Sequence, residues 1–67
     1  MDKKEKMDIL NSRYLILAIK YDETDYAVKT FRRLIDKYSE TDDEELYDYL
    51  NCFYNILFKF GSDGDTD

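Results

Sequence analysis

The side chains that could support catalysis or bind a metal are few in this chain. It has no histidine and one cysteine, Cys52, so a nucleophile would lack its usual base and a zinc ion would lack ligands. Cys52 lies among apolar residues at helical spacing, which is typical of an inert core thiol. Asp63, Asp65 and Asp67 have the spacing of the first calcium-loop ligands, but the glycine and glutamate that complete such a loop do not follow. We therefore expect no enzymatic activity, metal or cofactor.

Aromatic side chains are more abundant, and they favour contact with another protein. The chain has seven tyrosines and four phenylalanines, which provide large contact areas at low entropic cost. From Leu46 to Phe60 the polar residues form one narrow stripe, although a surface helix needs an apolar face of only about 100°. The alternative interpretation is that these large side chains fill a small core. The side chains that we expect to contact a partner are Tyr14, Tyr47, Tyr49, Tyr54 and Phe58.

Acidic residues are concentrated in one segment. Residues 40–48 contain six acids and no base, and the formal net charge of the chain is −6. This charge disfavours direct binding to nucleic acid or to an anionic membrane, because phosphates repel it. The acids either stabilise a helix start and keep the protein soluble, or they imitate DNA phosphates in a basic groove. This acidic patch consists of Glu40, Asp42, Asp43, Glu44, Glu45 and Asp48.

Three segments with helical spacing of apolar residues must position these side chains. They cover about residues 6–21, 25–38 and 42–60. Short polar links between them favour antiparallel neighbours. The sequence therefore predicts one all-α domain over residues 1–67, an antiparallel three-helix bundle, with flexible tails at 1–5 and 62–67. A helical hairpin with an outward-swung first helix is the alternative.

Candidate caps mark the predicted helix ends. Thr41 and Glu44 have the spacing of a capping box, which predicts that the third helix starts directly after Thr41. If Thr41 is not the cap, the helix begins at Asp42 or Asp43 instead. Thr24 or Asp22 is expected to cap the second helix, and Gly61 is expected to end the third.

The small size of the chain favours association. A core formed by 67 residues rarely supplies more than about 3–5 kcal/mol without a disulfide, a metal or a partner subunit. The first and third helices also have more apolar residues than one chain can cover, so we expect a homodimer. The longest apolar run near the N-terminus, Tyr14 to Ile19, is too short for a signal peptide or a membrane span, which predicts a cytoplasmic protein.

Two family resemblances accompany these patterns. Residues 30–37 followed by 42–46 resemble the small Hha/YmoA-type nucleoid modulators, which are helical proteins that bind a nucleoid protein. Residues 47–54 depart from the histidine-bearing motif of that family. The spacing of Ala27, Phe31 and Leu34 resembles a tetratricopeptide helix.

Together these observations predict a small acidic protein-binding regulator or inhibitor, which docks on a host protein through an aromatic helical surface. The chain is rich in Lys, Asp, Ile, Leu, Asn, Tyr and Phe and has no proline, tryptophan or histidine. This bias is typical of A/T-rich genomes and favours a phage or mobile-element origin. Two alternatives stay open: an acidic DNA mimic that blocks a nucleic-acid-binding protein, and a structural subunit or nucleoid-protein modulator.

Overall fold

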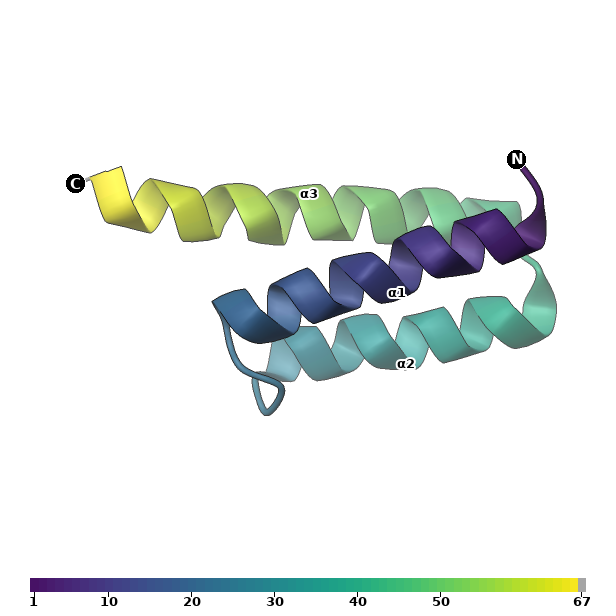
Figure 1. Ribbon diagram of the computed structural model, residues 1–67, viewed down its shortest axis with the longest axis horizontal. Helices are drawn as coiled ribbons and strands as arrows, with labels where there is room; N and C mark the ends of the chain where they lie inside the picture. The colour runs from purple at the N-terminus through teal and green to yellow at the C-terminus, as the bar shows by residue number, and fades with distance from the viewer. Residues whose placement is uncertain (67) are drawn as a thin grey trace.

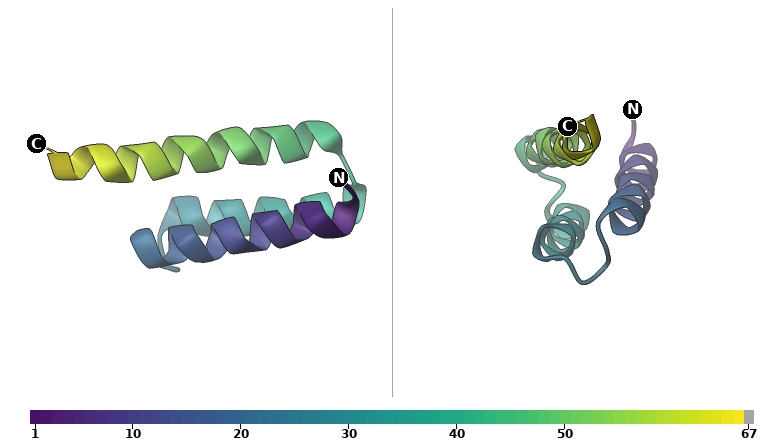
Figure 2. Two further views of the ribbon diagram at one scale, coloured as in Figure 1. Left: turned by 45° about the horizontal axis from the view of Figure 1, so that its top comes forward. Right: turned by 90° about the vertical axis from the view of Figure 1, so that its left-hand side faces the viewer.

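The computed structural model describes residues 1–66, and their side chains as far as Phe60. The chain forms three helices, α1 (Lys3–Lys20), α2 (Tyr26–Thr41) and α3 (Glu44–Thr66), and the described residues contain no strand. Each helix runs antiparallel to the next, so α1 and α3 are parallel (Figure 1). Every helix contacts the other two, and the end-on view shows them at the corners of a triangle (Figure 2). The predicted all-α three-helix bundle is thus confirmed.

Helix α1 begins at Lys3, earlier than the predicted start near residue 6. Asp2 and Glu5 form a capping box that satisfies two backbone amides at this end. The Asp2 carboxylate accepts a hydrogen bond from the backbone amide of Glu5 at 2.9 Å. In return, the Glu5 carboxylate accepts one from the backbone amide of Asp2 at 3.3 Å. Residues 3–5, predicted to belong to a flexible tail, are therefore helical.

The sequence predicts Thr24 or Asp22 as the cap of the second helix, but the cap of α2 is Asp25. The Asp25 carboxylate accepts a hydrogen bond from the Ala27 amide at 2.8 Å. Asp22 closes the preceding turn, because its carboxylate accepts from the Thr24 amide at 3.0 Å and the Thr24 hydroxyl at 3.1 Å. These hydrogen bonds hold the pKa of the Asp22 carboxyl below its ordinary value.

The link between α2 and α3 differs from the predicted capping box. Thr41 is the last residue of α2, and its hydroxyl donates to the Lys37 carbonyl at 2.9 Å. Asp42 follows in the left-handed conformation (φ 61°), which reverses the chain and keeps Thr41 in the preceding helix. Asp43 is the cap of α3, since its carboxylate accepts from the amides of Glu45 at 2.9 Å and Leu46 at 3.4 Å. The alternative start at Asp43 is the correct one.

Helix α3 is longer than predicted and extends beyond the ends of the other two helices (Figure 1). Its backbone continues through Gly61 to Thr66, so Gly61 does not end the helix at Phe60. The sequence predicts a flexible tail at residues 62–67. The side chains of these residues, and all of Asp67, lie outside the described part of the structure. The hydroxyl of Tyr21 donates to the Leu57 carbonyl, which ties the end of α1 to α3.

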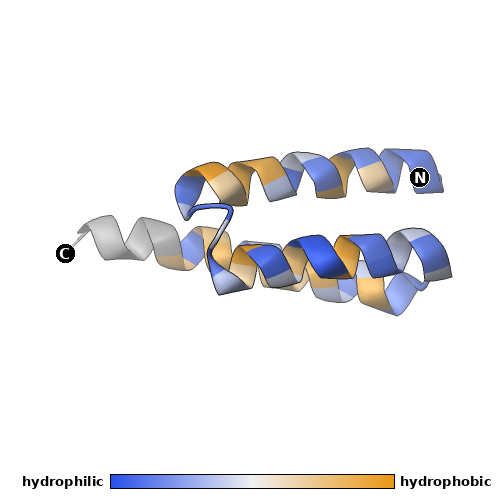
Figure 3. Ribbon diagram, turned by 90° about the horizontal axis from the view of Figure 1, so that it is seen from below, coloured by the Kyte–Doolittle hydropathy of each residue, from blue (hydrophilic) through white to orange (hydrophobic). Residues whose placement is uncertain are grey.

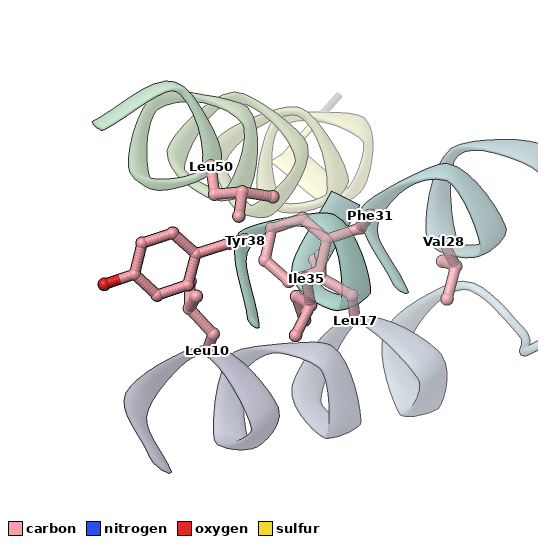
Figure 4. Packing of buried hydrophobic residues seen from close by; sticks show 7 residues of the cluster. All are labelled: Leu10, Leu17, Val28, Phe31, Ile35, Tyr38 and Leu50. Atoms are coloured by element: carbon pink, nitrogen blue, oxygen red, sulfur yellow. The ribbon is translucent and has the colours of Figure 1, made fainter. Parts of the chain in front are cut away.

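The core is small and centred on α2. Four buried residues of α2 at 3-4-3 spacing face two leucines of α1 and one of α3 (Figure 4). The Phe31 ring lies edge-on to Phe53 at 5.8 Å and 6.5 Å from the ring of Tyr54, so it joins α2 to α3. Burial of one such side chain contributes about 1.5–3 kcal/mol. The buried residues are Leu10, Leu17, Val28, Phe31, Ile35, Tyr38 and Leu50.

The cap at Asp43 gives a direct test of the α2–α3 link. Asp43→Ala leaves two amides of α3 without their acceptor, and we expect it to lower the free energy of unfolding by about 0.5–2 kcal/mol. Thr41→Ala is the matched control, because it removes only an exposed hydroxyl, and it should change stability by less than about 0.5 kcal/mol. Urea denaturation measures both variants. A larger effect for Thr41→Ala would restore the predicted capping box.

Candidate protein-interaction surface

The aromatic residues of α3 lie on two flanks of the helix. One flank faces α1 and contains Tyr47, Tyr54 and Phe58, whose rings lie beside basic side chains of α1. The other flank borders α2, where Phe53 contacts Phe31. Neighbouring side chains cover these two flanks to different extents.

On the α1 flank, three basic side chains at seven-residue intervals each lie over one ring. The Lys6 ammonium is 5.1 Å from the centre of the Tyr47 ring. The Arg13 guanidinium is 5.0 Å from that of Tyr54, and it also donates to the Asn51 side chain. Farther along, the Lys20 ammonium is 5.0 Å from the ring of Phe58. Each such cation–aromatic contact at the surface contributes about 0.5–1 kcal/mol.

These contacts change the interpretation of the predicted partner-binding residues. Tyr47 and Tyr54 are half-buried and pack against the core, so they are not set apart from it as expected. Tyr14 is also half-buried, and the Arg32 guanidinium lies 5.5 Å from its ring centre. Tyr49 and Phe58 are the exposed members, at 56% and 44%. The sequence contains one signal for this cover. Lys6 and Arg13 are seven residues apart, as are Tyr47 and Tyr54, and two parallel neighbouring helices bring positions with the same interval together.

The acidic patch is partly neutralised by α1. The Lys3 ammonium lies 3.5 Å from the Asp42 carboxylate and donates to the Ser39 carbonyl, at the end of α2, at 2.6 Å. The Lys6 ammonium lies 3.5 Å from the Glu44 carboxylate. Asp43 is occupied as the helix cap. The remaining members, Glu40, Glu45 and Asp48, make no ion pair with the described residues.

A groove between α1 and α3 leads to an exposed apolar region. It has a volume of about 430 Å³ and is lined by Asp8, Ile9, Ser12, Arg13, Ile16 and Tyr54. Beyond it, the second half of α1 has large apolar side chains in solvent, and Figure 3 shows this hydrophobic half clearly. Ile19 is 87% exposed and Leu15 is 60% exposed. Neither residue was among the predicted partner contacts, although both lie in the apolar run Tyr14 to Ile19 of the first predicted helix, which has more apolar residues than one chain can cover.

The flank of α3 that borders α2 is open. A hollow of about 250 Å³ is lined by residues of α3 alone, among them Phe53 and Leu57. The Tyr49 ring lies edge-on to Phe53 at 5.9 Å. Cys52 is exposed here, in contrast to the buried position predicted from its apolar context, because neither α1 nor α2 covers this part of α3. We call this surface the α3 stripe: Tyr49, Cys52, Phe53, Ile56 and Phe60.

The described part of the chain contains no group of three or more side chains suited to bind a metal ion. The side chains of Asp63 and Asp65, and all of Asp67, lie outside that part. None of the described helices combines the length and apolar character that crossing a membrane requires.

Comparisons with models of known protein families, with curated protein sequences and with solved structures find no match to this chain. The resemblances to Hha/YmoA-type modulators and to tetratricopeptide helices therefore gain no support. The fold and its surfaces are the remaining basis for a functional proposal.

The pKa values of two groups near the start of α1 predict a loss of stability at alkaline pH. Burial raises the pKa of the Tyr38 phenol above its ordinary 10.0. Burial alone would lower the pKa of Lys6, but Glu44, Tyr38 and Tyr47 outweigh it and raise the pKa above 10.5. A group whose pKa is raised by folding stabilises the protein below its unfolded pKa, and this contribution is lost as pH rises through the folded pKa.

We therefore expect the free energy of unfolding to fall as pH rises above about 10. Tyr38→Phe removes the phenol and should make this fall shallower, whereas exposed Tyr26→Phe serves as the control and should leave it unchanged. Urea denaturation from pH 8 to 11 measures the effect. An equally steep fall in Tyr38→Phe would show that the phenol does not contribute.

Truncation of Tyr54 and truncation of Tyr49 should change the stability of the fold by different amounts. Tyr54→Ala removes a half-buried ring that contacts Phe31 and stacks on Phe58 at 5.7 Å, and we expect it to cost about 1–3 kcal/mol. Tyr49→Ala removes an exposed ring and should cost less than about 1 kcal/mol. Thermal and urea unfolding compare the two. Equal stabilities would restore the original view of Tyr54 as an interface residue outside the core.

Proposed function

We propose that this chain is a small protein-binding regulator or inhibitor that docks on a host protein through apolar residues near the end of α1. The exposure of Ile19 (87%), together with that of Leu15 one turn earlier, is the observation that supports this function best. Adjacent large apolar side chains in solvent mark interaction sites. We call the residues involved the docking surface: Leu15, Ile16, Ile19 and Phe58.

The surroundings of the docking surface fit a protein partner. Lys20 lies beside it over Phe58, and Asp8 and Ser12 line the adjoining groove. An apolar centre with a polar rim is typical of protein interfaces. The groove runs along α1, so an amphipathic helix with apolar side chains at three- and four-residue spacing is the kind of partner segment that fits it.

The acidic-mimic alternative has weaker support. A mimic of DNA needs carboxylates available to a basic groove, but Lys3 and Lys6 pair with Asp42 and Glu44, and Asp43 is engaged as a cap. No observation specifically favours the structural-subunit or nucleoid-modulator alternatives. On the basis of the amino-acid sequence alone, we further propose that the protein acts in the cytoplasm of a host cell and that a phage or mobile element encodes it.

The docking surface can be tested with charge substitutions at exposed positions. Leu15→Asp combined with Ile19→Asp should leave the helical content and melting temperature unchanged, because both sites are in solvent. It should weaken binding to a partner captured from host lysate by at least about thirtyfold, as expected for loss of about 2 kcal/mol at a hot spot.

The matched control neutralises acids that make no ion pair. Glu45→Gln combined with Asp48→Asn should retain the partner, and binding by the unmodified chain should persist in about 0.5 M salt because apolar contacts are not screened. If the control loses the partner and Leu15→Asp with Ile19→Asp retains it, the acidic surface is the functional one.

A further inference from the structure

The α3 stripe is a second apolar surface, distinct from the docking surface. Tyr49, Phe53, Ile56 and Phe60 recur at 4-3-4 spacing, the interval at which one helix packs along another. Ile56 and Phe60 are 54% and 67% exposed, and Phe53 is seated on Phe31 of the core. The stripe is therefore held in place by the core and lacks a covering helix within the described residues.

One edge of the α3 stripe is basic and belongs to α2. Arg32 lies over Tyr14 of α1, so the Arg32 side of α2 faces α1. Lys37 is about 140° around the helix from Arg32, which places it on the side toward α3. Lys37 is exposed and makes no ion pair with the described residues.

At the level of Tyr49, the other edge is acidic and belongs to α3. Phe53 contacts α2, and the helical wheel places Glu45 and Asp48 beyond Tyr49, on the side of the stripe away from α2. The rings of Tyr38 and Tyr47 are 5.6 Å apart, so Lys37 and Asp48, each adjacent to one of these tyrosines, lie at nearly the same height along the bundle. The α3 stripe thus has a basic edge and an acidic edge at one level.

We propose that the α3 stripe binds a second copy of this chain, with the two α3 helices parallel about a two-fold axis along the bundle. A two-fold interface uses the same surface on both copies, so that surface must contain both partners of every ion pair. A two-fold axis parallel to α3 places the basic edge of each copy against the acidic edge of the other at the same height. Lys37 then faces Glu45 and Asp48 of the second copy, and the apolar residues meet between them. An antiparallel arrangement would instead separate Lys37 from these acids, because it places the level of Tyr49 in one copy opposite the level of Phe60 in the other.

Sedimentation equilibrium of the full chain over a wide concentration range tests the assembly. We expect a reversible monomer–dimer equilibrium. Ile56→Glu places a charge in the centre of the stripe and should weaken dimerisation at least about tenfold without changing helical content. A monomer at all concentrations, or a dimer unaffected by Ile56→Glu, would overturn the proposal. It would also be overturned if a foreign protein bound to the stripe of a monomeric chain.

Charge exchange tests the pairing of the edges. Lys37→Glu should weaken the dimer, and Lys37→Glu combined with Asp48→Lys should restore it. Lys4→Glu makes the same charge change at an exposed position of α1 away from the stripe and should leave the dimer unchanged. Failure of the combined variant to restore dimerisation would overturn the opposed-edge arrangement.

A cross-link distinguishes the parallel from the antiparallel orientation. In a Cys52→Ser background, Phe60→Cys should form a disulfide-linked dimer under mild oxidation, because equivalent residues meet in the parallel dimer. In the antiparallel dimer the two positions lie near opposite ends of the stripe, so the absence of this cross-link would overturn the orientation. Leu15→Asp with Ile19→Asp should not affect any of these dimer measurements, which separates this inference from the proposed function.

Discussion

The structure depends on how little of α3 the core can bury. Four residues of α2 and two of α1 are fully buried, and Leu50 is the single fully buried residue among the described side chains of α3. The other described apolar side chains of α3 are partly buried against the core or exposed on the flanks of the helix. The surfaces of this protein are thus a direct consequence of a small core surrounded by aromatic-rich helices.

The two flanks of α3 are covered by different means. Toward α1, long basic side chains lie over the rings, and their methylene groups cover aromatic surface while the charged ends stay in water. Toward α2, Phe53 contacts Phe31, but Ile56 and Phe60 stay exposed, so much of the α3 stripe is left open. This asymmetry gives the bundle two exposed apolar surfaces, one at the end of α1 and one along α3.

The distribution of charge follows from the same packing. The parallel orientation of α1 and α3 places the start of α1 beside the start of α3, where Lys3 and Lys6 meet the acids of the α2–α3 link. The acids in this region therefore contribute to closing one end of the bundle. Glu45 and Asp48 are exposed beside the α3 stripe and make no ion pair with the described residues.

The amino-acid sequence by itself determined the number, type and approximate extent of the helices, because apolar spacing reflects the helical period directly. It also contained the correct caps at Asp2 and Asp43, but a choice among adjacent Thr and Asp residues requires the path of the chain between helices. Only the tertiary structure decided that Tyr47 and Tyr54 are covered while Ile19 and Cys52 are exposed. The helical period gives the angle of each side chain around its own axis, whereas its cover depends on which neighbouring helix lies at that angle.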